Sequence, residues 1–170
     1  MDNTALFKLT YGLYVVGVKN GSGFGGSVVD AVAQVSSAET PNLILSSMKR
    51  NYTNELIHTE REFTLSVLPG NVDPFVVANF GFQSARTVDK WANVSHEIKD
   101  GLPVLTDTAA CIRCKVIDLR EFETHTMFIT DVVDAWPGGN DSLPLVYENY
   151  QRDMKDLAFA AFTAFKEKNS

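Results

Sequence analysis

The sequence of 170 residues is long enough for one domain with a substantial core, so a single domain over residues 1–170 is expected. Hydrophobic residues make up 45% and charged residues 21%, which excludes a disordered or fibrous chain. The formal net charge of −6 argues against a nucleic-acid or anionic-membrane surface. Because no apolar run approaches the ~20 residues that span a bilayer and the first residues lack a signal-peptide layout, we expect a cytoplasmic protein.

The first half of the chain predicts strands joined by tight turns. Residues 13–18 and 28–36 are rich in β-branched side chains, and the Asn-Gly-Ser-Gly segment at 20–23 between them favours a hairpin. Residues 43–45 indicate a further buried strand, and residues 63–67 alternate as a strand does. The glycines at 21–26 also satisfy the G-x-G-x-x-G dinucleotide pattern, but strand-like valines follow instead of a helix, so we interpret them as a hairpin loop.

A hydroxyl-rich, basic tract follows the strand at 43–45. Thr53 is the expected N-cap of a short helix, so free backbone N–H groups would converge there with Lys49 and Arg50. An anion such as phosphate is stabilised at such a helix start. The alternative is that the serines, Asn51 and Thr53 only form a turn and a cap.

The second half predicts short helices, two long strands and a terminal helix. Asp73 followed by Pro74 predicts a helix to about residue 80, and Ser84 is a candidate cap for the next one. Residues 109–135 indicate two strands that reverse near 120–124, and many short strands favour a closed β-barrel. The apolar period of the terminal helix is carried by five residues: Tyr150, Met154, Leu157, Ala161 and Phe165.

Cys111 and Cys114 form a C-x-x-C pair, which invites a redox or metal interpretation. Their surroundings are typical of a strand, on which positions i and i+3 point to opposite faces. We therefore expect structural thiols, and no metal site, because none of the three histidines has zinc-finger spacing.

Three blocks occur in a recognisable order: the tract from Ser46 to Thr53, the segment Phe80-Gly81-Phe82-Gln83-Ser84 with Asp89-Lys90-Trp91, and His125-Thr126-Met127-Phe128-Ile129. Together they resemble the flavin reductase-like family of FMN-binding split-barrel proteins, which includes flavoredoxins and the flavin domain of high-molecular-weight rubredoxins. The similarity covers roughly residues 6–150. It implies a mainly β fold with short helices, namely an FMN-binding split β-barrel of Greek-key type with a C-terminal helix.

The resemblance also implies a cofactor site for FMN. Amide and hydroxyl groups would meet the isoalloxazine edge, a second set would hold the ribityl chain and phosphate, and a third would shape the wall or supply polar contacts. These sets are, in order: Gln34, Val35 and Ser36; Ser46, Ser47, Lys49, Asn51 and Thr53; Phe80, Gly81, Ser84, Lys90 and His125. In relatives an aromatic residue of the tail approaches the flavin, and the candidates here are Phe159, Phe162 and Phe165. The alternative, which we favour, is that all three belong to the helix core or to a dimer contact. Asp30 lies where relatives commonly place Asn or Thr.

The function implied by the resemblance is that of an FMN-dependent oxidoreductase. A homodimer would pass electrons from NAD(P)H or a protein donor to flavin, ferric iron, or a rubredoxin-like or flavodiiron partner. No catalytic acid or base is assigned, because hydride transfer to flavin N5 requires none. Two alternatives remain: a non-enzymatic flavin-binding or sensory module, and a flavin-free structural barrel.

Overall fold

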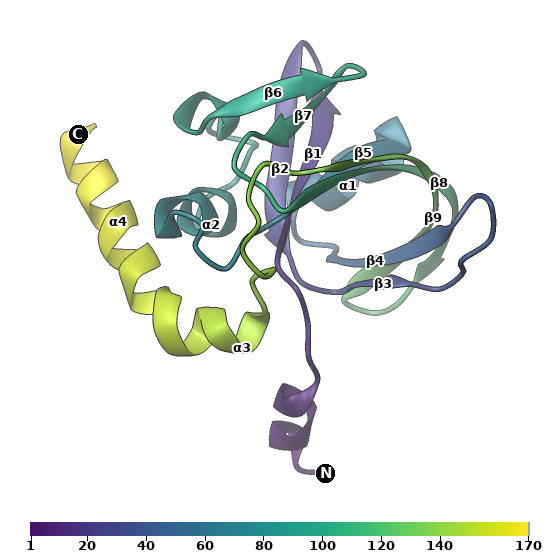
Figure 1. Ribbon diagram of the computed structural model, residues 1–170, viewed down its shortest axis with the longest axis horizontal. Helices are drawn as coiled ribbons and strands as arrows, with labels where there is room; N and C mark the ends of the chain where they lie inside the picture. The colour runs from purple at the N-terminus through teal and green to yellow at the C-terminus, as the bar shows by residue number, and fades with distance from the viewer. Residues whose placement is uncertain (170) are drawn as a thin grey trace.

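A computed structural model describes residues 1–169 of the chain (Figure 1). Seven strands form one curled antiparallel sheet in the order β2-β1-β5-β8-β9-β4-β3, and a separate hairpin pairs β6 with β7. The strands are β1 Tyr14–Asn20, β2 Gly23–Val29, β3 Val32–Gln34, β4 Asn42–Met48, β5 Glu62–Val67, β6 His96–Lys99, β7 Leu102–Leu105, β8 Ala110–Glu121 and β9 His125–Pro137. The mainly β half-barrel with a C-terminal helix confirms the predicted fold class.

The predicted strands are confirmed where neighbouring residues in the sequence specify a turn between them. The hairpin of β1 and β2 turns at Gly21, whose φ of +61° is a conformation that glycine adopts without strain. The pair of β8 and β9 also reverses where expected. The predicted strand at 28–36 is wrong as a single element, because the chain leaves β2 after Val29 and begins β3 only at Val32.

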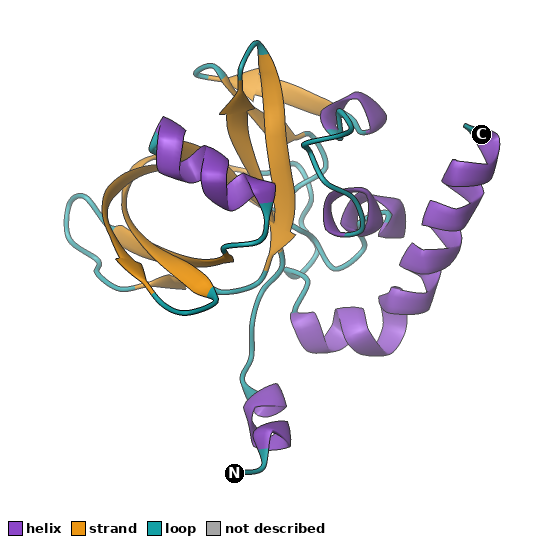
Figure 2. Ribbon diagram, turned by 180° about the vertical axis from the view of Figure 1, so that it is seen from behind, coloured by secondary structure: helices purple, strands orange, loops and turns teal. Residues whose placement is uncertain are grey.

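Helix α1, Tyr52–Glu60, lies across the mouth of the curled sheet and closes its interior (Figure 2). Leu56 and Ile57 are buried there against Phe63 and Phe128 of the sheet. Burying these side chains removes apolar surface from water and fixes the helix in place. The start of α1 is thereby held at one end of the barrel.

Two of the three predicted helix starts need correction. The N-cap of α1 is Asn51, and Thr53 is a buried residue inside the first turn. No α-helix begins at Ser84; its Oγ accepts from the Arg86 N–H in a turn, and only the 3₁₀ helix η2, Trp91–Asn93, follows. The third start is confirmed, since the Asp73 carboxylate accepts from Phe75 N–H at the beginning of α2, Pro74–Gly81.

The C-terminal arm is a continuous helical segment made of α3 (Tyr147–Asn149), the π-helical turn Tyr150–Met154, and α4 (Lys155–Lys168), which packs along α2 (Figure 1). Tyr150, Met154 and Ala158 are buried, whereas Leu157 is 58% exposed. The predicted stripe is wrong at Leu157, whose place in the packed face is taken by Ala158, one position later, after the π-turn. Ala161 and Phe165 are partly buried as predicted, and the Phe165 ring lies 4.8 Å from that of Phe75.

Both cysteines are buried and unbonded on β8, which bulges between Arg113 and Cys114. Cys114 belongs to the barrel core, and burial raises the pKa of its thiol to about 12. The thiolate needed for redox or metal chemistry is therefore strongly disfavoured. Within residues 1–169, no helix is both long enough and apolar enough to cross a membrane.

Candidate functional site

A groove between the curled sheet, α2 and the C-terminal arm consists of two adjoining chambers, which share Val28, Asn51, Gly81 and Phe82. The apolar chamber, of about 200 Å³, is lined by Leu13, Val28, Val29, Asp30, Ala31, Ser46, Ser47, Met48, Asn51, Val77, Gly81, Phe82, His125, Tyr147 and Tyr150. The polar chamber, of about 310 Å³, is lined by Ser27, Val28, Arg50, Asn51, Tyr52, Thr53, Phe80, Gly81, Phe82, Gln83, Ser84, Ala85 and Lys90.

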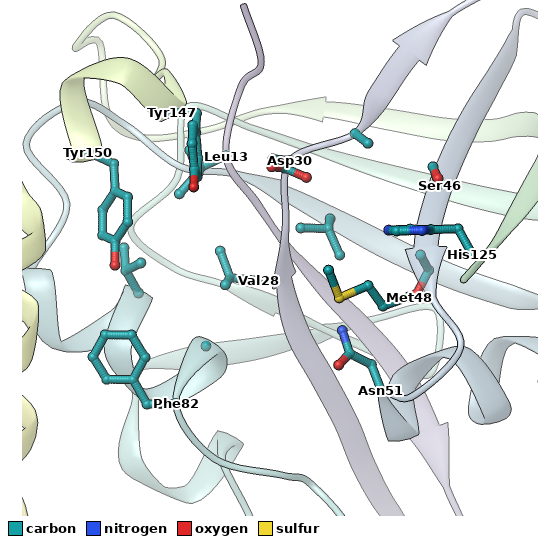
Figure 3. A pocket seen from close by; sticks show the side chains of 15 residues that line it. Leu13, Val28, Asp30, Ser46, Met48, Asn51, Phe82, His125, Tyr147 and Tyr150 are labelled. Atoms are coloured by element: carbon teal, nitrogen blue, oxygen red, sulfur yellow. The ribbon is translucent and has the colours of Figure 1, made fainter. Parts of the chain in front are cut away.

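The apolar chamber is assembled from parts of the chain that are far apart in sequence (Figure 3). Met48 and His125 lie opposite each other at the paired ends of β4 and β9. Asp30 lies where the chain passes from β2 to β3, and Tyr147 and Tyr150 enter from the C-terminal arm. A slot with apolar walls and a few polar groups suits a flat, largely apolar ligand.

The polar chamber lies at the N-terminus of α1. The Asn51 side chain makes no capping hydrogen bond, so the first N–H groups of the helix are available to a ligand. Thr53 lies in this first turn and is only 2% exposed, and Arg50 precedes it. Hydrogen-bond donors, a helix dipole and a cation at one place favour an anionic group such as phosphate.

Lys90 is a buried cation in the wall of the polar chamber. Its Nζ donates to the carbonyl oxygens of Gly26 and Phe80, each at 2.9 Å, and so joins β2 to the end of α2. Burial lowers the pKa of this ammonium group to about 8, because the charged form loses hydration. No carboxylate in residues 1–169 pairs with Lys90, and an anionic ligand would supply the missing counter-charge.

Two buried hydroxyl groups have no hydrogen-bond partner among the described residues. Ser27 Oγ lies in the polar chamber and Ser47 Oγ in the apolar chamber, with residue exposures of 7% and 3%. An unsatisfied buried hydroxyl costs about 1–3 kcal/mol, so such groups occur mainly where a ligand or water completes them. Both chambers therefore fit one elongated ligand with a flat apolar body and an anionic tail.

Most of the residues that the sequence predicts for the site line these chambers. In the apolar chamber they are Ser46, Ser47, Asn51, Gly81 and His125; in the polar chamber they are Asn51, Thr53, Phe80, Gly81, Ser84 and Lys90.

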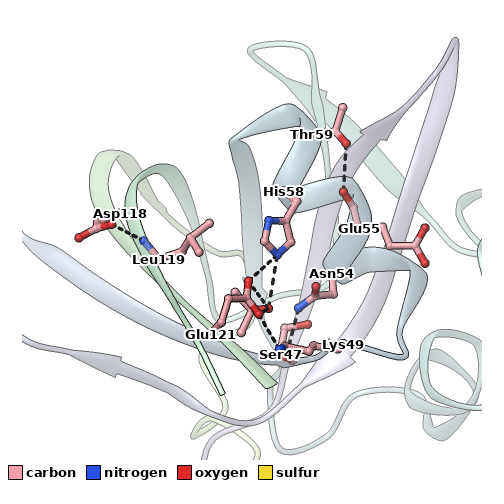
Figure 4. A network of polar contacts seen from close by, with 10 residues as sticks. Ser47, Lys49, Asn54, Glu55, His58, Thr59, Asp118, Leu119 and Glu121 are labelled. Carbon is pink, nitrogen blue, oxygen red and sulfur yellow. Dashed lines mark hydrogen bonds and ion pairs between the residues drawn. The ribbon is translucent and has the colours of Figure 1, made fainter. Parts of the chain in front are cut away.

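Four predicted site residues lie outside both chambers. Gln34 is the exposed last residue of β3, and exposed Val35 follows it. Ser36 is half-buried, and its Oγ donates to Asn42 Oδ1 at 2.7 Å. Lys49 points into a different polar network, in which its Nζ lies 2.8 Å from Glu121 Oε2, beside His58 (Figure 4). Asp30 and Ala31 line the apolar chamber, and Arg50 lines the polar chamber.

The aromatic residues that reach the groove come earlier in the arm than predicted. Tyr147 and Tyr150 line the apolar chamber, whereas Phe159 and Phe162 pack on Phe82 with ring centroids 4.6 and 5.7 Å away. Ser27 was also missed. Its one sequence signal is its position directly after Gly25 and Gly26, where the lack of side chains lets other segments approach β2 closely.

The sequence matches a known protein family over most of its length. The family model described as "Flavin reductase like domain" matches residues 6–157. The chain belongs to this family. It is accordingly a flavin reductase-like flavoprotein and an oxidoreductase.

Two curated relatives and one solved structure illustrate the family. The high molecular weight rubredoxin of Moorella thermoacetica is 34% identical, over 99% of this chain and 75% of its own length. The ferric-chelate reductase (NAD(P)H) of Archaeoglobus fulgidus is 30% identical, over 98% of this chain and 99% of its own length. The structure of flavin reductase PheA2 in its native state superposes with a TM-score of 0.72 at 25% identity, over 86% of this chain and 93% of that one.

Proposed function

We propose that the groove binds FMN, with the isoalloxazine ring in the apolar chamber and the phosphate in the polar chamber. The observation that carries this proposal is the pair of unsatisfied buried hydroxyls, one in each chamber. Ser47 and Asn51 would bind polar atoms of the ring and ribityl chain. Thr53, Ser27, Lys90 and the first N–H groups of α1 would bind the phosphate.

Contacts around the outer end of the polar chamber favour FMN over FAD. The Arg86 guanidinium lies 4.2 Å from the centre of the Tyr52 ring and forms an ion pair with Glu55, while Tyr52 Oη donates to Asn20 Oδ1 at 3.0 Å. These contacts join the start of α1 to the loop after α2 and to the turn between β1 and β2. The adenylate part of FAD would have to extend past these contacts, whereas FMN ends at the phosphate.

The reaction proposed is reduction of the bound flavin by NAD(P)H or by a protein donor, followed by transfer to free flavin, ferric iron or a small redox protein. FMN, when bound, supplies the hydride- and electron-accepting chemistry. The chain's own residues position the ring between Val28 and the tyrosines, exclude water from one side and hold the phosphate. The names of the relatives from Moorella and Archaeoglobus match two of these three acceptors, a small redox protein and ferric iron.

A second copy of the chain is the proposed structural partner. The N-terminal 3₁₀ helix η1, Asn3–Lys8, projects away from the body of the molecule (Figures 1 and 2). Leu6 and Leu9 are each more than half exposed there, and Leu143 is 85% exposed. Exposed apolar side chains of this kind mark a surface that is covered in an assembly.

The proposed function is tested by an anaerobic titration of the apoprotein with FMN, FAD and riboflavin, followed by NADH and then NADPH, read by flavin absorbance and fluorescence. We expect FMN to bind most tightly and one nucleotide to bleach the bound flavin band. A protein that binds none of the three flavins contradicts the cofactor proposal. Bound FMN that neither nucleotide bleaches would instead assign the donor role to a protein.

A further inference from the structure

Asp30 is the one acidic residue among the fifteen that line the apolar chamber (Figure 3). It lies in the two-residue link between β2 and β3, and its carbonyl oxygen accepts from the Val32 N–H at 2.9 Å. This bond anchors the backbone of the link where it passes the chamber. The Ala31 carbonyl oxygen also accepts from the Ser46 N–H of β4, at 2.9 Å, so the backbone that carries the carboxylate is held against the sheet.

No counter-charge accompanies this carboxylate. Within residues 1–169, Asp30 takes part in no ion pair and no side-chain hydrogen bond. The other titratable groups facing the chamber are His125, Tyr147 and Tyr150, and burial raises the pKa of Tyr150, which keeps it neutral. His125 directs its Nδ1 to Thr124 Oγ1 at 2.8 Å.

The basic residues near the groove either line the polar chamber or form an ion pair outside it. Lys90 and Arg50 line the polar chamber, and Lys49 forms its ion pair with Glu121. The groove thus has a positive end, where an anionic tail would bind, and a negative charge at the end with apolar walls. A flavin bound in the proposed orientation would have the carboxylate beside its ring and the cations beside its phosphate.

We propose that Asp30 lowers the reduction potential of the bound flavin. This inference rests on the proposed function. Reduction adds electron density to the ring, and a nearby unpaired carboxylate repels it, most strongly where water is largely excluded. The oxidised flavin therefore binds more tightly than the reduced flavin, and the bound cofactor becomes a stronger donor to its acceptor.

The test compares midpoint potentials of the FMN-loaded protein at pH 7, measured anaerobically against indicator dyes, for wild type, Asp30→Asn and Asp30→Ser. The ratio of the dissociation constants of oxidised and reduced FMN should rise about tenfold in both variants, which corresponds to a potential about 30 mV higher for a two-electron couple. Asp141→Asn is the matched control, because Asp141 is exposed and outside both chambers. It should leave the potential unchanged.

Two outcomes overturn the inference. One is an unchanged or lowered potential in the Asp30 variants, which includes an equal change of affinity for both redox forms. The other is an equal rise of the potential in the Asp141→Asn control. If wild-type protein fails to bind FMN, the proposed function fails first. That result is seen in the initial titration before any variant is made, so the two failures are distinguishable.

Discussion

The two chambers of the groove differ in how firmly their walls are held. In the polar chamber, Thr53 and Lys90 are almost fully buried, and Lys90 is fixed by two backbone carbonyls. In the apolar chamber, Met48 and Tyr147 are more than a third exposed. The end that would anchor a cofactor therefore contains buried polar side chains held by the backbone, and the end that would hold its reactive ring has partly exposed side chains beside it.

This difference follows from what each end must do. A cofactor group that stays bound is held more tightly by preorganised hydrogen-bond donors, because ordering these donors costs no further free energy on binding. A ring that exchanges electrons with a donor and an acceptor needs a face that either can approach. The following predictions test whether the polar chamber is indeed the rigid, anchoring half.

The largest effect is expected for Gly26→Ala in β2. A methyl group at Gly26 would clash with the Val16 carbonyl oxygen, and this backbone atom cannot move away without disturbing the pair of β1 and β2. We expect the free energy of unfolding to fall by roughly 3 kcal/mol, measured by urea denaturation.

Gly23→Ala in the same strand is the matched control, since its added carbon would meet only the Asn20 carbonyl oxygen, at 3.9 Å. It should leave the free energy of unfolding within about 1 kcal/mol of wild type. An equal loss of unfolding free energy in the two variants would show that the close approach of Gly26 to Val16 is not what makes this position sensitive.

The next effect concerns Lys90 and pH. Burial lowers the pKa of Lys90 to about 8, from 10.5 for an unperturbed lysine, so between these values the unfolded chain binds more protons than the folded apoprotein. The contribution of Lys90 to the free energy of unfolding is therefore lowest below pH 8. It rises by up to about 3 kcal/mol as the pH approaches 10.5.

Other groups titrate in the same interval, so the informative quantity is the difference in slope between wild type and Lys90→Met in urea denaturation from pH 7.5 to 10. The variant should lack the rise that wild type shows. Parallel curves for the two proteins would mean that Lys90 is not held as a buried cation in the folded state.

The smallest effect contrasts Thr53 with Lys49. Thr53→Val should weaken FMN binding by about 1–2 kcal/mol, because a buried hydroxyl facing the phosphate is lost, while riboflavin affinity stays unchanged. Lys49→Ala should change either affinity by less than about 0.5 kcal/mol, since Lys49 is partly exposed and paired with Glu121. Fluorescence titration with both ligands measures the contrast, and the reverse ranking would move the phosphate site towards Lys49.

Sequence reasoning predicted the parts of this molecule that short-range chemistry determines. The turn at Gly21, the Asp73 cap with Pro74 and the reversal between β8 and β9 each depend on a few adjacent residues. The polar chamber was predicted well for the same reason, because Asn51 and Thr53 belong to one helix start.

The apolar chamber was harder to predict, because its residues meet only through strand register and packing. Gln34 and Asp30 are four residues apart, and the break between β2 and β3 decides which of them reaches the groove. Likewise, Tyr147 and Tyr150 reach the chamber because the start of the C-terminal arm packs beside it, and the π-turn at residues 150–154 precedes the change of the buried position from Leu157 to Ala158. Neither the break nor the turn has a distinct signature in the local sequence.

The bonds that Lys90 and Trp91 make to β2 also affect how the protein behaves in concentrated solution. Strand β2 is the last in the order of the sheet, and the edge of a sheet is where a strand of another molecule could add. The Trp91 indole N–H donates to the Gly25 carbonyl oxygen and the Lys90 ammonium group to that of Gly26, each at 2.9 Å, so side chains from outside the sheet are bonded to the backbone of this strand. A variant that removes these bonds leaves more of the backbone of β2 available to another molecule, and should aggregate more readily in concentrated solution.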